Sequence, residues 1–167
     1  MGPTDRALFL SLKPAYAELV LSGEKTVELR RIRPRAAPGT LVVVYASTPV
    51  RAVVGTCIVE AIGSEAPAVI WNLHGQRTGV CRSEFNTYFY GRTIAVAITV
   101  GRPHRLERPI SLDAVRQGLD CFAPPQSFRY LTPVQAMVLV PEQWTAHCIR
   151  AGVPALSQPT SVSITAE

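Results

Sequence analysis

Lysine is scarce in this chain: it supplies two of the seventeen basic residues, Lys13 and Lys25, and arginine supplies the rest. Arginine binds phosphate well but does not release its proton, whereas lysine can do so when its surroundings lower its pKa. Proton transfer by a basic aliphatic side chain is therefore limited to two positions. The alternative is that the scarcity reflects composition alone, in which case neither lysine has a special role.

Features that define secreted and membrane proteins are missing. The cysteines at positions 57, 81, 121 and 148 show no Cys-x-x-Cys spacing, and nothing at the N-terminus resembles a signal peptide. We therefore expect reduced thiols in a cytoplasmic protein. The apolar runs are far shorter than the ~20 residues that a membrane helix needs, so we expect no membrane partner.

Cofactor and metal patterns are missing as well. The three histidines and four cysteines form no zinc signature. The segment Gly-Glu-Lys-Thr over residues 23–26 lacks the upstream glycine of a phosphate-binding P-loop, and it precedes a predicted strand instead of a helix. We expect no cofactor and no metal, and ATP hydrolysis is disfavoured.

The sequence does contain a core and a local excess of positive charge. Its 167 residues are 47% hydrophobic and 17% charged, with a formal net charge of +5, which fits one globular domain. Residues 23–35 carry five basic side chains against two acidic ones. Solvent, a partner or a bound anion must offset the repulsion within such a cluster, and RNA and DNA are common polyanionic partners. A plain solubilising surface is the alternative.

The hydrophobic pattern predicts short strands with helices between them. Period-two alternation and β-branched runs indicate strands over residues 6–12, 26–30, 41–46, 52–62 and 93–100, with a turn at 101–103. Pro14 and Gly23 bound a helix of about ten residues. Further helices are predicted in two pieces within 65–90, the second over 83–90, at 111–118, and at 134–148 with a break at Pro141.

Five or six short strands with inserted helices do not fit a doubly wound parallel sheet, because residues 40–62 lack a helix after each strand. We predict an α+β fold, a small β-barrel of five or six strands with helices packed around a cleft. Residues 1–132 are predicted to form the domain, 133–150 a C-terminal helical extension and 151–167 a flexible tail.

The order of residues around the basic cluster resembles a known family. The motif Gly23-x-Lys25-x-x-Glu28-x-Arg30 follows Ser-Leu-Lys-Pro at 11–14 and precedes Pro-Gly at 38–39. This arrangement, across roughly residues 6–100, resembles the ASCH domain of the PUA-like superfamily, whose fold is a small β-barrel with helices around a cleft. The resemblance implies a nucleic-acid or nucleotide ligand. Relatives include amidohydrolases that deacetylate modified cytidine, a ribonuclease, and domains linked to transcription coactivators.

The resemblance also implies roles for individual residues. Lys25 matches the motif lysine, whereas Glu28 stands where the amidohydrolase branch has threonine. That branch places a catalytic glutamate near the helix before the late strand, and Glu84 is the only candidate here. These departures weaken the case for deacetylation more than the case for the fold.

Lys25 and Glu28 are the predicted catalytic residues. Four arginines near Lys25 disfavour its charge, and a neutral amine could act as general base on water or on a ribose 2′-hydroxyl. Glu28 could hold that amine or return a proton to a leaving group. The alternative is a catalytically silent surface ion pair between the two.

A second set of residues is predicted to bind the ligand. Arginines on the strand and in the following loop suit phosphate, and the segment 122–130 offers aromatic rings, an amide and a hydroxyl for an unpaired base. Phe122 and Phe128 are expected to pack in the barrel instead. The predicted substrate-binding residues are Lys13, Arg30, Arg31, Arg33, Gln126, Ser127 and Tyr130.

The sequence thus favours binding of single-stranded RNA or a modified nucleoside in a basic cleft. The enzymatic alternative is a metal-independent hydrolase, either a ribonuclease or an N-acyl-cytidine amidohydrolase. The third possibility is a regulatory protein-interaction module. The sequence leaves open the identity of the ligand and the oligomeric state.

Overall fold

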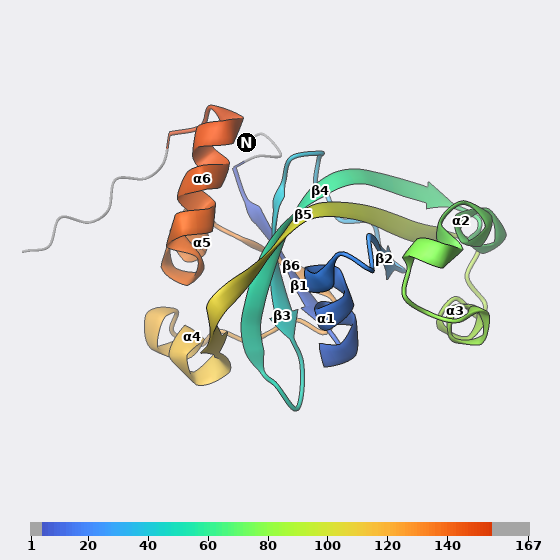
Figure 1. The fold of residues 1–167 in the computed structure, drawn as a ribbon, viewed down its shortest axis with the longest axis horizontal. Coiled ribbons are helices and arrows are strands. Elements are labelled where there is room, and N and C mark those ends of the chain that lie inside the picture. The colour runs from blue at the N-terminus through green and yellow to red at the C-terminus, as the bar shows by residue number, and fades with distance from the viewer. Residues whose placement is uncertain (1–4, 155–167) are drawn as a thin grey trace, which may run out of the picture.

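The computed structural model describes residues 5–154, which form a curled six-stranded sheet flanked by helices (Figure 1). The strand order is β2-β5-β4-β3-β1-β6, in which β1 and β3 are parallel and the other neighbours antiparallel. The predicted α+β fold is confirmed, with the sheet forming a half-barrel. The strands are β1 Ala7–Leu12, β2 Val27–Arg30, β3 Leu41–Ala46, β4 Ala52–Glu65, β5 Ala95–Ser111 and β6 Phe128–Leu131.

The helices lie where the sequence predicts, with ends that differ by up to three residues. Proline occupies the first turn of α1, where its missing N–H has no helical partner, and Gly23 ends the helix with φ of 83°. Pro141 separates α5 from α6, as expected. The helices are α1 Pro14–Ser22, α2 Pro67–His74, the short 3₁₀ helix η1 Gly75–Arg77, α3 Arg82–Tyr88, α4 Leu112–Gly118, α5 Pro133–Leu139 and α6 Pro141–Ala151.

Strands β1 and β3 are buried on both faces, which explains their continuous apolar sequences. Because side chains alternate along a strand, Phe9 and Tyr45 join the core beneath α4, α5 and α6. Leu10 and Val44 face the other way and join the core beneath α1. Tyr45 is therefore held on the side of the sheet that faces the C-terminal helices.

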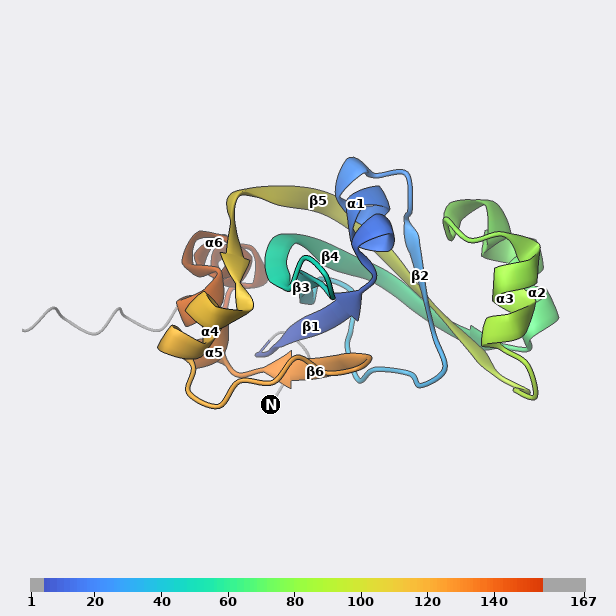
Figure 2. The ribbon, with the colours of Figure 1, turned by 90° about the horizontal axis from the view of Figure 1, so that it is seen from below.

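Two strands extend beyond their predicted ends, β4 by three residues and β5 by eleven. β4 has 14 residues and β5 has 17, and together they form the long hairpin that carries α2 and α3 at its far end (Figure 2). The turn expected at Gly101–Pro103 is wrong, because β5 continues through this segment by means of a bulge in its pairing with β4. Arg102 there has a φ of 51°.

The C-terminal helices pack on the same core as the sheet. Ala136 and Leu139 of α5, and Trp144 and Cys148 of α6, are buried together with Phe9. The division between a domain at 1–132 and an extension at 133–150 stays a prediction, although the two parts share this core. The tail predicted at 151–167 lies outside the described residues from position 155 onward.

Candidate functional site

The motif residues Lys25, Glu28 and Arg30 form one buried ion-pair network. The alternation of β2 puts Val27 and Leu29 into the core next to α2 and α3, and Glu28 and Arg30 on the opposite face. The Glu28 carboxylate lies 3.1 Å from the Lys25 ammonium and 2.9 Å from the Arg30 guanidinium. Lys25 is 1% exposed, Glu28 6% and Arg30 5%. The spacing predicted this association, but not its burial.

The Lys25 ammonium has a partner for each of its three donors. It donates to the backbone carbonyls of Val27, at 3.0 Å, and of Thr78, and it pairs with Glu28. The ring of Tyr16 lies 5.4 Å from the Lys25 nitrogen and covers it further. The amine is therefore fully coordinated and shielded from solvent.

Arg30 connects this network to a neighbouring pocket. Its guanidinium donates to the carbonyl and hydroxyl oxygens of Ser127, both at 3.2 Å, and to the carbonyl of Ser11 at 3.1 Å. These two serines lie in β1 and just before β6, which are neighbours in the sheet. The network thereby fixes the backbone beside the pocket.

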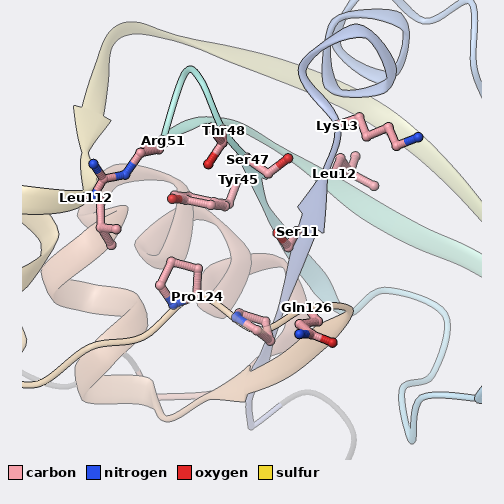
Figure 3. Close-up of a pocket in the computed structure, with 11 residues that line it drawn as sticks. Ser11, Leu12, Lys13, Tyr45, Ser47, Thr48, Arg51, Leu112, Pro124 and Gln126 are labelled. Atoms are coloured by element: carbon pink, nitrogen blue, oxygen red, sulfur yellow. The ribbon is translucent and has the colours of Figure 1, made fainter.

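The pocket has a volume of about 430 Å³, which is within the range of ligand sites. It opens between the end of β1, the turn after β3 and the proline-rich segment before β6 (Figure 3). Its charged and aromatic lining comes from Lys13, Tyr45 and Arg51. The remaining lining residues are Ser11, Leu12, Ser47, Thr48, Leu112, Pro124, Pro125 and Gln126.

Tyr45 and Arg51 form a donor pair in this pocket. Burial raises the pKa of the Tyr45 phenol, and the guanidinium groups of Arg51 and Arg116 partly offset the rise. The phenol therefore keeps its proton at neutral pH, and the Arg51 guanidinium lines the same pocket. Figure 3 shows the Tyr45 side chain in the middle of the pocket, with its hydroxyl directed to the side of Arg51.

The backbone at Arg51 is held in an unusual conformation. Its φ is 51°, in the left-handed region that residues with a side chain rarely occupy. Its N–H donates to the Ser47 carbonyl at 3.2 Å, and its carbonyl accepts from the Leu112 N–H at 2.8 Å. Strain of this kind persists where the surroundings fix the residue, and it clusters at functional sites.

The predicted binding residues are divided between the pocket and other surfaces. Gln126 and Lys13 line the pocket, and Ser127 adjoins it through Arg30. The Lys13 ammonium, however, is directed away from Tyr45 in Figure 3 and lies 6.0 Å from the Tyr16 ring.

The remaining predicted residues lie outside the pocket. Arg31 donates to the Tyr88 carbonyl at 2.8 Å and covers that ring, and Arg33 donates to Ser64 at 2.9 Å. The hydroxyl of Tyr130 accepts from the Arg35 N–H at 2.6 Å. The guanidinium of Arg6 lies 4.6 Å from the centre of the Tyr130 ring. One ring face of Tyr130 is thus covered, which leaves it less suited to stacking on a base than predicted.

The packing role expected for Phe122 is confirmed: it is 4% exposed and its ring meets Phe9 edge-on. Phe128 is half-buried against the core beneath α1. Trp71 packs on Phe85, with ring centroids 5.0 Å apart. Burial lowers the pKa of the nearby His74, and Arg77 lowers it further.

Glu84 lies closer to the motif than its position in the sequence indicates. Its carboxylate accepts a hydrogen bond from the Cys81 N–H at 2.9 Å, which lowers the pKa of Glu84, and it meets the Tyr16 hydroxyl at 3.4 Å. Because the Tyr16 ring also faces Lys25, these three residues form a continuous cluster.

Tyr45 and Arg51 are functional candidates that the sequence did not reveal. Tyr45 ends a run of buried β-branched residues and so is typical of a core position. Arg51 lies outside the basic cluster, in a turn that contains Ser47, Thr48 and Pro49. The feature of the sequence that could have indicated Tyr45 is a tyrosine near the end of a buried strand, just before a polar turn.

Within 5–154, no three side chains of histidine, cysteine, aspartate or glutamate come together as a metal site would require. In the same range, no helix is both long and apolar enough to cross a bilayer.

The fold and site define an α+β protein with a PUA-like half-barrel and a basic pocket beside its first helix. Residues 10–100 match the ASCH domain family. An ASCH domain-containing ribonuclease from Zymomonas mobilis is 33% identical over 138 residues, which cover 83% of this chain and 93% of that protein. The chain belongs to the ASCH domain family.

Solved structures agree with this assignment. The crystal structure of ASCH from Zymomonas mobilis has a TM-score of 0.78 at 32% identity, covering 81% of this chain and 94% of that one. A serine-to-alanine variant of that protein has a TM-score of 0.79 at 31% identity, covering 84% of this chain and 98% of that one. The N-terminal domain of McrB from Staphylothermus marinus shares the fold alone. Its TM-score is 0.51 at 9% identity, and the match covers 81% of this chain and 93% of that one.

Proposed function

We propose that this protein binds single-stranded RNA in the 430 Å³ pocket and cleaves its phosphodiester bonds. The observation that carries the proposal is the pairing of a permanent cation, Arg51, with a neutral phenol, Tyr45, inside one cavity. The relative from Zymomonas mobilis, a ribonuclease that is 33% identical to this chain, supports it. Binding was the first hypothesis from the sequence, and this relative gives weight to cleavage as well.

The pocket residues suit a transesterification. The ribose 2′-hydroxyl oxygen loses its proton to hydroxide from the solvent and attacks phosphorus, while the bond from phosphorus to O5′ breaks. The Tyr45 phenol supplies a proton to O5′ and regains one from water, so that the products are a 2′,3′-cyclic phosphate and a 5′-hydroxyl. Arg51 stabilises the negative charge on the phosphorane oxygens.

Other residues bind the strand in this proposal. The side-chain amide of Gln126 can both donate and accept hydrogen bonds with the edge of a base at the rim of the pocket. Lys13 carries a charge at the exposed mouth, and the exposed Arg31 and Arg33 provide phosphate contacts outside the pocket. Ser127 stays at the wall, where Arg30 holds it.

Lys25 and Glu28 support the pocket instead of reacting in it, because their charged groups are occupied by each other, by Arg30 and by backbone carbonyls. The catalytic roles predicted for them stay predictions. Their burial favours a bracing role, in which Arg30 transmits the rigidity of β2 to Ser11 and Ser127.

Cleavage of matched oligonucleotides tests the function. A labelled single-stranded RNA should be cut to fragments with a cyclic phosphate, whereas the same sequence in DNA or with 2′-O-methyl groups should bind and stay intact. Binding of the uncut analogue should weaken as salt increases. An RNA that is neither bound nor cut by protein at micromolar concentration would contradict the proposal.

The cleavage rate should depend on pH in a specific way. None of the lining residues is a histidine, aspartate or glutamate, so the 2′-hydroxyl loses its proton to solvent base. The rate is therefore expected to rise about tenfold per pH unit between about pH 6 and 9. Because the pKa of Tyr45 is raised from 10.0, its proton is retained across that range, and the rate should level off only above pH 10, where loss of the phenol proton offsets the gain in hydroxide.

This profile is measured with a labelled oligonucleotide after subtraction of the protein-free rate at each pH. A plateau below pH 9 would instead indicate an amine or imidazole acting as general base. Lys13, the amine that lines the pocket, would then be the candidate base.

The amidohydrolase is the second candidate, because Glu84, Tyr16 and Lys25 lie in one cluster. Incubation with N4-acetylcytidine and mass spectrometry of the products tests it, since loss of the acetyl group would establish the activity. The regulatory interaction module and the cytoplasmic location stay predictions from the sequence.

A further inference from the structure

A second cavity of about 270 Å³ lies on the other side of the Lys25 network and shares no lining residue with the first. It is bounded by the end of α1, by Arg77 of η1, and by the middle of β4 and β5. The function proposed above does not use it. Its lining contains two arginines and one glutamate at its rim, Arg77, Arg102 and Glu60.

Two irregularities of the β4–β5 pairing shape this cavity. Between the pairs Ile58–Gly101 and Thr56–His104, β5 has one more residue than β4, and Arg102 lies in this bulge. Between Val59–Val100 and Ala61–Thr99 the extra residue is Glu60 of β4. Bulges redirect side chains and are frequent next to functional sites. Here they place an arginine and a glutamate at the same cavity.

The backbone around the bulges is adapted to this arrangement. Arg102 has a φ of 51°, as Arg51 has in the first pocket, so each cavity is lined by one arginine with a left-handed backbone. A side chain at Gly101 would collide with the Glu60 carboxylate, which shows how closely that carboxylate approaches β5. Conformations of this kind are stable only where the surroundings enforce them.

The charged groups of the cavity are positioned but largely unpaired. Arg77 donates through Nε to the Thr26 hydroxyl at 2.9 Å, which orients the guanidinium and leaves its terminal nitrogens available. Neither Arg102 nor Glu60 forms an ion pair with any residue in the range 5–154. Lys25 contributes positive charge at the base of the cavity, although its donors are occupied.

We propose that this second cavity binds the phosphate group of a nucleotide. Arg77 and Arg102 would donate to the phosphate oxygens, as guanidinium groups do in phosphate sites. Glu60 would accept a hydrogen bond from a sugar hydroxyl or a base amino group, which a bare phosphate does not offer. A volume of 270 Å³ is at the small end for ligand sites and fits one nucleotide. The proposal requires nucleotide binding and does not require cleavage.

Calorimetric titration of the full chain with two probes tests the proposal. The probes are adenosine 5′-monophosphate and a single-stranded 2′-O-methyl oligonucleotide, and the variants are Arg102→Gln and Arg77→Gln. Arg108→Gln is the matched control, because Arg108 is an exposed arginine of the same strand that lines neither cavity. Thermal unfolding of each variant establishes that it is folded.

Each cavity variant should weaken binding about tenfold, as expected for a lost charge-assisted hydrogen bond, and the control should change it far less. For the oligonucleotide, the slope of log affinity against log salt should also fall by about one. Weaker binding of both probes by the two variants indicates a free nucleotide as ligand, and weaker binding of the oligonucleotide alone indicates a nucleotide within a strand. Equal effects of Arg102→Gln, Arg77→Gln and Arg108→Gln on both probes would overturn the proposal.

The two functions can fail separately. If the wild-type chain does not cut RNA but Arg102→Gln still weakens nucleotide binding, the ribonuclease proposal is wrong and the second site stands. If RNA is cut and the two arginine variants bind like the control, only the second site is wrong.

Discussion

Replacing Arg51 by glutamine is expected to reduce kcat for cleavage of single-stranded RNA by about 10²- to 10³-fold, the usual effect of removing one donor to an oxyanion. The guanidinium lines the pocket together with the Tyr45 phenol, and its positive charge partly offsets the rise in the pKa of that phenol. Glutamine retains much of the volume and a hydrogen-bonding amide, so the loss reports mainly the charge. Single-turnover cleavage of a labelled oligonucleotide measures it.

The matched control is Arg150→Gln, which removes an exposed arginine of α6 that lines neither cavity. Both variants have the same net charge, so a nonspecific loss of RNA affinity would lower their rates equally. Equal rates would therefore show that the pocket is not the site of cleavage, and the assignment would have to be abandoned.

Tyr45→Phe gives the companion result. Its ring packs against Phe9 with a centroid separation of 5.5 Å, and phenylalanine preserves that contact. The loss of the phenol proton should lower kcat by about 10²-fold with little change in KM. The levelling of the rate expected above pH 10 should also disappear, because no phenol remains to ionise.

Much of the fold could be predicted from local patterns. The continuous apolar sequences of β1 and β3 indicate strands buried on both faces, and Pro14 and Gly23 mark the ends of α1 through conformational preferences of their own. The length of the β4–β5 hairpin could not be predicted. Gly101 and Pro103 are typical of a turn, and only pairing with β4 carries the strand through them.

Part of the candidate site could also be predicted from local spacing, and the rest depends on contacts between distant residues. The three-residue spacing of Lys25 and Glu28, and the two-residue spacing of Glu28 and Arg30, bring those charges together locally. Their burial depends on contacts with Thr78 and Ser127, which lie 53 and 97 positions away from Lys25 and Arg30. Sequence periodicity contains no information on contacts between residues so far apart in the chain. It therefore does not distinguish a surface ion pair from a buried network.

The buried network itself leads to the second large prediction, that Glu28→Gln lowers the free energy of unfolding by about 3–5 kcal/mol. The variant leaves the cations of Lys25 and Arg30 buried without their shared counterion, and neither can reach solvent from a position at most 5% exposed. Urea denaturation followed by tryptophan fluorescence measures the change.

Glu18→Gln is the matched control for this measurement. It breaks the ion pair with Arg105, in which both side chains are at least half exposed, so its effect on stability should fall within experimental error. Cleavage by the folded fraction of Glu28→Gln then separates the two roles of the motif. If Glu28 only braces the pocket, Glu28→Gln should lose stability, and added ligand should partly restore it. The value of kcat per folded molecule should then fall only modestly. A variant as stable as the wild type but without turnover would mean that Glu28 reacts, and the bracing role would be wrong.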